Sequence, residues 1–145
     1  MRRRWALAGL LCGALQGAWA QADTPGVALR SDGVYVSREQ VDDETYCEYL
    51  RFYPTGTVIT VSSECGPEAL ESLKAWFRAS RAGPKVSGVS RGRVVHRGNR
   101  ISFRAVSKEG AVRFEGHAFE NHLVLRSHSE INGHDDQQRF DFVRW

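Results

Sequence analysis

One pentapeptide in this chain has the spacing of a catalytic motif. Residues 88–92 are Gly-Val-Ser-Arg-Gly and fit G-x-S-x-G, the nucleophile elbow that presents a reactive serine in α/β-hydrolases. The elbow works only where a strand of a parallel sheet turns sharply into a helix. No helical pattern follows Gly92, and the chain lacks the alternating strands and helices of that fold. We therefore expect no serine hydrolase and, with no other catalytic set in the sequence, no enzyme.

Histidines and carboxylates gather in a second stretch that invites a metal interpretation. His128, Glu130, His134, Asp135 and Asp136 lie close together in the sequence. A zinc or copper site needs three or four ligands that converge on the ion, and this spacing is not typical of one. Such residues at turns and on outward strand faces are ordinarily solvated. We expect no metal site and no other cofactor.

Cys47 and Cys65 form an even pair, because the third cysteine, Cys12, lies in an N-terminal leader described below. In an exported chain such a pair predicts one disulfide. The alternative is a redox or metal pair, but the sequence has no C-x-x-C motif and no histidine near either cysteine. We therefore expect a structural disulfide.

The basic residues are unevenly distributed along the chain. Residues 72–108 contain ten basic and no acidic residues, whereas residues 21–71 contain three basic and ten acidic ones. Arginine predominates in the basic segment, and its guanidinium binds carboxylates and phosphates through two parallel hydrogen bonds. The segment therefore suggests an anion-binding patch for an acidic polysaccharide, a lipid headgroup or an acidic partner. The candidate patch consists of Arg91, Arg93, Arg97, Arg100 and Arg104.

A second interpretation of the same segment remains open. Neighbouring strands from the acidic parts of the chain would place Glu48, Glu115 or Asp141 beside the arginines, so that the charges compensate one another within the fold. Nucleic acid is not expected as a partner under either interpretation, because stacking aromatic residues are not interleaved with the arginines.

The elements that would position these residues are mostly strands. Period-two alternation, rich in β-branched and aromatic residues, recurs from residue 33 onward and predicts eight strands. Short connections favour antiparallel neighbours, and closure into a barrel removes exposed sheet edges. We expect a mainly β fold, an antiparallel eight-stranded up-and-down barrel. The predicted strands span residues 33–37, 46–53, 57–62, 93–96, 101–106, 111–117, 123–127 and 139–145.

One segment between the third and fourth strands has helical spacing instead. Pro67 suits the first turn of a helix, and the pattern ends before Gly83. We therefore expect one inserted amphipathic helix that covers the sheet. Its apolar face would consist of Leu70, Leu73, Trp76 and Phe77.

The N-terminus has the three parts of a secretory signal peptide over residues 1–20: three arginines, an apolar run and Ala-Trp-Ala. We expect cleavage near Ala20/Gln21, a tail over residues 21–30 and a single domain over residues 31–145. The expected location is the periplasm or the medium. Without the leader the chain carries 17 basic and 17 acidic residues, and no later run is apolar enough for a transmembrane segment.

The strand order and one end-to-end signature make the chain resemble the lipocalin-like (calycin-type) barrels. In that superfamily a Gly-x-Trp opens the first strand, and a basic residue near the last strand packs across that ring. Gly33 and Tyr35 match the first element, with tyrosine in place of tryptophan, and Arg144 matches the second. The alternative is that Tyr35 and Arg144 are ordinary residues at the barrel end.

The resemblance implies a barrel whose interior is either filled by side chains or holds one small ligand. The residues expected to line such a cavity are Tyr35, Tyr49, Phe103, Phe114, Leu125 and Phe142. The first hypothesis for function is an exported, non-enzymatic binding protein for a small amphipathic or anionic ligand or an envelope component. The second is a periplasmic protein-interaction module, an enzyme inhibitor or accessory subunit, with a filled barrel.

Overall fold

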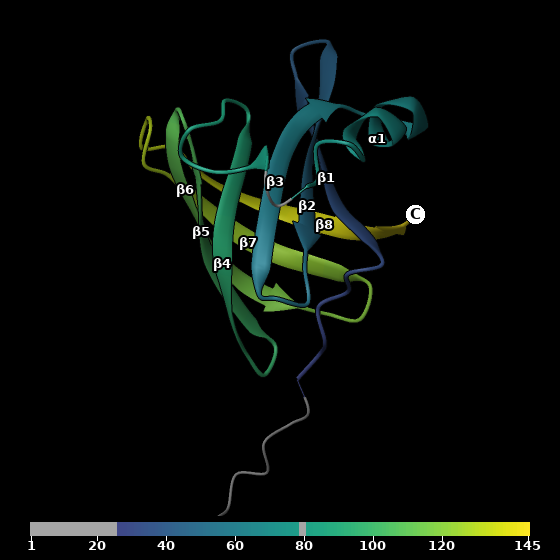
Figure 1. The fold of residues 1–145 in the computed structure, drawn as a ribbon, viewed down its shortest axis with the longest axis vertical. Helices are drawn as coiled ribbons and strands as arrows, with labels where there is room; N and C mark the ends of the chain where they lie inside the picture. Colours follow the sequence, from purple (N-terminus) through teal and green to yellow (C-terminus); the bar gives the residue numbers. More distant parts are fainter. Residues whose placement is uncertain (1–25, 79–80) are drawn as a thin grey trace, which may run out of the picture.

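Eight antiparallel strands close into a barrel in the computed structural model, which describes residues 26–78 and 81–145 (Figure 1). Each strand pairs with the next, and β1 pairs with β8, which confirms the predicted fold class and strand number. The architecture is compatible with a lipocalin-like fold. The elements are β1 (Gly33–Val41), β2 (Glu44–Phe52), β3 (Thr57–Glu64), α1 (Pro67–Leu73), β4 (Val89–Arg97), β5 (Arg100–Ser107), β6 (Gly110–Ala118), β7 (His122–Ser129) and β8 (Asp135–Arg144).

The N-terminal predictions fall largely outside this description. The expected signal peptide over residues 1–20, Cys12 within it and residues 21–25 of the expected tail lie outside the described residues. Among the residues that are described, no helix is long and apolar enough to cross a membrane.

Aromatic rings fill the lower part of the barrel, at the end where β1 begins. Tyr35 contacts Phe142 and Phe52 edge-on at centroid distances of 5.1 and 5.5 Å. Phe52 contacts Phe103 at 5.8 Å, and Phe103 stacks on Phe114 at 4.7 Å. The rings thus form a continuous chain across the barrel from β8 to β6. With the aliphatic residues around them they make up the interior cluster, whose buried members are Tyr35, Leu50, Phe52, Val58, Ile101, Phe103, Ala105, Phe114, Ala118, Leu123, Leu125 and Phe140.

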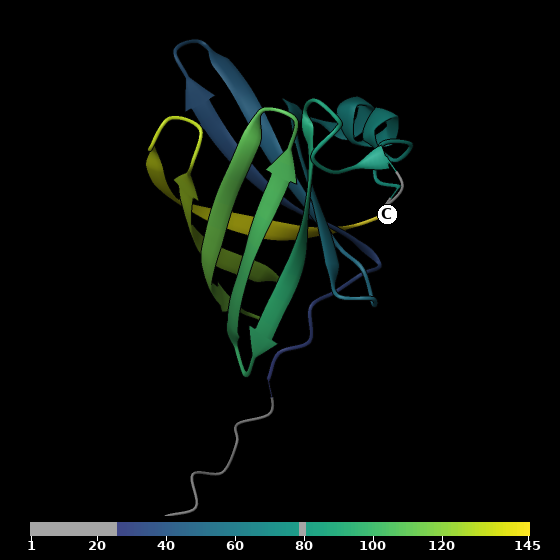
Figure 2. The same cartoon turned by 60° about the vertical axis from the view of Figure 1, so that its left-hand side comes forward.

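A second hydrophobic cluster lies outside the barrel, beneath α1. Side chains alternate along a strand, so the other faces of β1, β2 and β3 also present apolar residues. The helix and the chain after it cover these faces, as Figures 1 and 2 show. We call this the outer cluster; its buried members are Val34, Cys47, Tyr49, Ile59, Val61, Leu73, Phe77 and Val89.

The helix is shorter than the sequence predicts. It ends at Leu73, so Trp76 and Phe77 lie beyond it. The N–H groups of both residues still donate to the Leu73 carbonyl, at 2.8 and 3.2 Å, as the last turn tightens and the chain leaves the helix. Phe77 is buried against Trp145, whereas Trp76 is half exposed. Burial of Phe77 against the strands, rather than helical spacing, therefore decides where this ring lies.

The predicted disulfide is confirmed. Cys47 on β2 bonds to Cys65, which follows β3, and closes a loop with a sequence separation of 18 residues. Cys47 lies opposite Ser63 in the β2–β3 register, so Cys65 sits just past the strand end. The bond joins the β2–β3 hairpin to the start of α1 at the edge of the outer cluster.

We predict that the double substitution Cys47→Ser and Cys65→Ser lowers the free energy of unfolding by about 3 kcal/mol, because it removes a constraint on the unfolded chain. Urea unfolding followed by tryptophan fluorescence measures the loss. Reductant should produce a similar loss in the unmodified protein and none in the double variant. An unchanged midpoint in the variant would show that the bond contributes little to stability.

Candidate functional site

Five of the six residues expected to line a ligand cavity lie on the inner face of the barrel. Tyr35, Phe103, Phe114 and Leu125 are buried members of the interior cluster, and Phe142 packs against it. Tyr49 lies in the outer cluster instead, where its hydroxyl donates to the Glu64 carbonyl at 2.8 Å. Side chains alternate between the two faces of a strand. Because Leu50 and Phe52 point inward from β2, Tyr49 points outward. The five inward side chains pack against one another, so they occupy the space that an apolar ligand would need.

The segment before β1 covers the lower end of the barrel. Leu29 packs against the interior cluster, and the Arg30 guanidinium lies 3.8 Å from the centroid of the Phe142 ring. The backbone N–H of Arg30 donates to the Tyr35 hydroxyl at 3.1 Å. Residues 26–32 thus run beneath the barrel (Figures 1 and 2), and the part of the expected tail that the structure describes packs on the core.

The end-to-end signature is only partly realised. Arg144 lies opposite Gly33 in the β1–β8 register, at the same end of the barrel as Tyr35. Its guanidinium, however, donates to Asp32 at 3.0 Å on the outside of the barrel. The cation that packs on an aromatic ring at this end is Arg30, which the sequence pattern did not single out.

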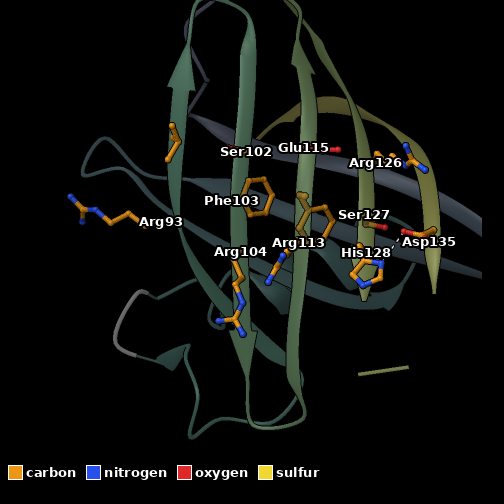
Figure 3. A pocket seen from close by; sticks show the side chains of 12 residues that line it. Arg93, Ser102, Phe103, Arg104, Arg113, Glu115, Arg126, Ser127, His128 and Asp135 are labelled. Atoms are coloured by element: carbon orange, nitrogen blue, oxygen red, sulfur yellow. Dashed lines mark hydrogen bonds and ion pairs between the residues drawn. The ribbon is translucent and has the colours of Figure 1, made fainter. Parts of the chain in front are cut away.

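The largest groove described lies on the outer face of β4–β7 and has a volume of about 610 Å³ (Figure 3). A second groove of about 440 Å³ continues it toward the lower end. Phe103 and Phe114 also border the first groove, but their rings are buried in the barrel. We call this surface the arginine face; its charged lining residues are Arg93, Arg97, Arg100, Arg104, Arg113, Glu115, Arg126 and Asp135.

Glu130 neutralises part of the arginine face. Its carboxylate, in the turn between β7 and β8, accepts hydrogen bonds from Arg104 at 2.7 Å and from Arg113. The bond from Arg104, with further help from Arg113, lowers the pKa of Glu130 to about 2. Charge compensation within the fold therefore does occur, but at Glu130.

Among the described residues, the carboxylates that the sequence suggested as partners form no ion pair with the patch arginines, although Glu115 does line the groove. Asp141 pairs with Arg139 at 2.9 Å on β8. Glu48 lies at the upper end of the barrel. Glu115 lies opposite Arg126 in the β6–β7 register but forms no ion pair with any described residue.

Four arginines of the arginine face have no carboxylate partner among the described residues. They are Arg93, Arg97, Arg100 and Arg126. Arg97 lies directly opposite Arg100 across the β4–β5 hairpin, and Arg104 lies directly opposite Arg113. Like charges at directly opposed positions destabilise a sheet. Glu130 bridges the second pair, so the pair of Arg97 and Arg100 is the one left for an anion from outside to neutralise.

Four members of the predicted anion patch line this face: Arg93, Arg97, Arg100 and Arg104. Arg91 lies farther along β4, outside the groove. Arg91, Arg93 and Arg97 alternate outward along β4, and Arg100 and Arg104 do so along β5. The structure adds Arg113 and Arg126 from the next two strands, which period-two alternation could have indicated. It also adds Val95, which is 53% exposed among the arginines.

A second candidate site lies at the upper end, where β1 and β8 part. Their pairing ends at Val36 and Asp141, so the β1–β2 hairpin projects beyond it. A cavity of about 180 Å³ opens there. We call it the acidic mouth; it is lined by Ser37, Glu39, Val41, Tyr46, Cys47, Glu48, Ser62 and Gln138.

Glu48 is a carboxylate of the acidic mouth whose pKa is strongly shifted. It forms no hydrogen bond or ion pair with any described residue, and burial raises its pKa to about 7. The neighbouring carboxylates Glu39 and Asp136 add to the increase through repulsion. The mouth therefore concentrates negative charge where no basic side chain lines the cavity.

The structure also places the G-x-S-x-G pentapeptide and the histidine-rich stretch that the sequence singled out. Ser90 lies in β4, which is followed by β5 and not by a helix. The Nδ1 atom of His128 donates to the Asp135 carboxylate at 2.9 Å. The described residues contain no group of three or more side chains suited to holding a metal ion.

Comparison of the chain with protein-family models, curated proteins and solved structures finds no match.

We predict that Glu48→Gln raises the free energy of unfolding at pH 8 by about 1–3 kcal/mol. The folded protein keeps Glu48 protonated up to about pH 7, whereas the unfolded chain releases the proton near the ordinary value of 4.5. Stability contributed by this group is thus present below pH 4.5 and lost as the pH rises to about 7. Glutamine does not ionise, so the variant escapes that loss.

Urea unfolding at pH 4, 6 and 8 measures this difference. The variant and the unmodified protein should have similar midpoints at pH 4 and diverge as the pH rises. Glu120→Gln, on an exposed turn at the lower end, is the matched control and should follow the unmodified protein. Identical midpoints for Glu48→Gln and the unmodified protein at pH 8 would mean that Glu48 is freely solvated.

Proposed function

We propose that this chain is an exported, non-enzymatic binding protein of lipocalin-like type that recognises an acidic polysaccharide of the cell envelope. The observation that carries the proposal is the set of four arginines on the arginine face that form no ion pair with a carboxylate of residues 26–78 or 81–145. Binding takes place on the outside of the barrel, because packed rings occupy its apolar interior.

The spacing of the arginines favours a polymer over a single small anion. Outward residues on a strand recur at about 6.8 Å, so Arg93 and Arg97 lie about 14 Å apart along β4. Arg100 and Arg104 add a second row on β5. A chain with an acidic group on successive sugars presents charges along such rows, whereas a single small anion engages one or two guanidinium groups.

The electrostatics also suit a polyanion. Each guanidinium that pairs with a carboxylate on the polymer relieves the repulsion between Arg97 and Arg100 or between their neighbours. Glu130 holds Arg104 and Arg113 in place beside the groove and leaves the four remaining arginines available. Because the groups are exposed, added salt should weaken the interaction steeply.

A protein partner is the second candidate function. Val95 supports it, because an exposed apolar residue surrounded by arginines resembles the composition of protein interfaces. The filled barrel agrees equally with an interaction module. An acidic protein surface would meet the same arginines, so the polymer experiment below separates the two candidates.

Binding of an alginate oligosaccharide of about ten uronic acids, measured by calorimetry at low salt, tests the proposal. We predict that Arg97→Gln with Arg100→Gln weakens binding roughly 2- to 30-fold, since an exposed ion pair contributes about 0.2–1 kcal/mol. The matched control is Arg78→Gln with Arg81→Gln, which removes two arginines outside the groove and should bind normally. Dextran, which is neutral, should not bind.

If the two double variants lost affinity for alginate equally, binding would depend only on the net charge of the protein, and the proposal would be wrong. If glucuronate monomer bound as tightly as the alginate oligomer, the proposal that the ligand is a polymer would be wrong. Absence of any alginate binding would leave the protein partner as the better account of the arginine face.

A further inference from the structure

The acidic mouth is a cavity whose polar lining consists of hydrogen-bond acceptors and hydroxyl groups. Ser37, Glu48 and Ser62 lie side by side on three strands, because Glu48 pairs with Ser37 of β1 on one side and Ser62 of β3 on the other. Gln138 of β8 closes the opposite wall. The residues that line the cavity include two carboxylates and no lysine, arginine or histidine.

One buried acceptor in this wall has no partner. The Gln138 side-chain amide donates to Asp136 at 2.9 Å, and its Oε1 atom is buried without a hydrogen bond from any described residue. Exchanging the amide nitrogen and oxygen would not help, since the Asp136 carboxylate needs a donor. A buried acceptor left unsatisfied costs free energy, so a donor is expected to occupy the space in front of it.

Glu48 requires the same kind of occupant. Its carboxylate is ringed by acceptors and other acids, and no described cation neutralises it. A positively charged group with several N–H donors would satisfy Glu48, Gln138 Oε1 and the flanking serine hydroxyls together. The described residues offer no group of metal ligands here, so an organic cation suits the cavity better than a metal ion.

We propose that the acidic mouth is a binding site for a small primary alkylammonium ligand, held by Glu48 and Gln138. The ammonium group donates to these two side chains, while Val41 and the Tyr46 ring provide an apolar wall for the alkyl chain. A volume of about 180 Å³ corresponds to roughly six water molecules at ~30 Å³ each, which matches an amine of four or five carbons. The site is separate from the arginine face and does not depend on its function.

Titration of the ¹⁵N-labelled protein with n-butylammonium at pH 8, followed by NMR, tests this site. The expected dissociation constant is on the order of 1 mM or tighter, in the range open to a ligand of about five heavy atoms. The Gln138 side-chain amide and the backbone amides of Ser37 and Ser62 should shift with a common saturation curve. Butan-1-ol, the neutral counterpart, should produce no saturable shift.

Two variants separate the site from general charge effects. Glu48→Gln keeps the shape of the cavity and should weaken butylammonium binding at least tenfold, whereas Glu120→Gln should leave it unchanged. Because Glu48→Gln is expected to be more stable than the unmodified protein at pH 8, loss of binding cannot be attributed to unfolding.

Three results would overturn the proposal. The first is the absence of saturable shifts in the unmodified protein, which would indicate that ordered water occupies the cavity. The second is equal binding by Glu48→Gln. The third is equally tight binding of tetramethylammonium, which carries the charge but has no N–H donor.

Discussion

The chain of aromatic rings across the barrel is the contact on which the rest of this structure depends. A closed barrel of eight strands has an interior just wide enough for side chains to fill, and here Phe142, Tyr35, Phe52, Phe103 and Phe114 fill its lower part in succession. Each ring comes from a different strand, so the contacts fix the curvature of the sheet as well as its core. With the apolar interior occupied, any ligand must be met on the outer face or at the upper end.

The arginine face and the acidic mouth carry opposite charge for the same geometric reason. Strand alternation directs the arginines of β4–β7 outward, and it directs Glu39 and Glu48 of β1 and β2 toward the upper interior. The wall of the barrel separates the two sets and keeps them from neutralising one another. The carboxylate that bridges Arg104 and Arg113 is Glu130 of the β7–β8 turn, which does not line the acidic mouth. Residues 21–145 carry 17 basic and 17 acidic side chains, and the described part of them thus presents a cationic groove and an anionic cavity.

The local sequence pattern was sufficient to predict the fold but not the candidate sites. Alternation and turn residues predicted eight strands, and the cysteine pair predicted the disulfide, because each depends on short-range spacing. Tyr49 was assigned to the wrong side because β2 is apolar on both faces: α1 covers the outer one, which alternation alone does not reveal. Two other features depend on tertiary contacts that local spacing does not reveal. Burial of Phe77 sets the end of the helix, and Glu130 reaches Arg104 from a turn 26 residues away in the sequence. The acidic mouth was missed because it requires knowing where β1 and β8 part.

We propose that this barrel binds an acidic polymer on its outer surface while its apolar interior stays closed. Chemical-shift mapping of the ¹⁵N-labelled protein with an alginate oligosaccharide tests this proposal, because it locates the contact on the strands. We expect shifts confined to the outward residues of β4–β7, with Arg93, Arg97, Arg100 and Arg126 at their centre and Leu50, Leu123 and Leu125 unaffected. Shifts centred on the interior cluster, or on β1–β3 beneath α1, would contradict it.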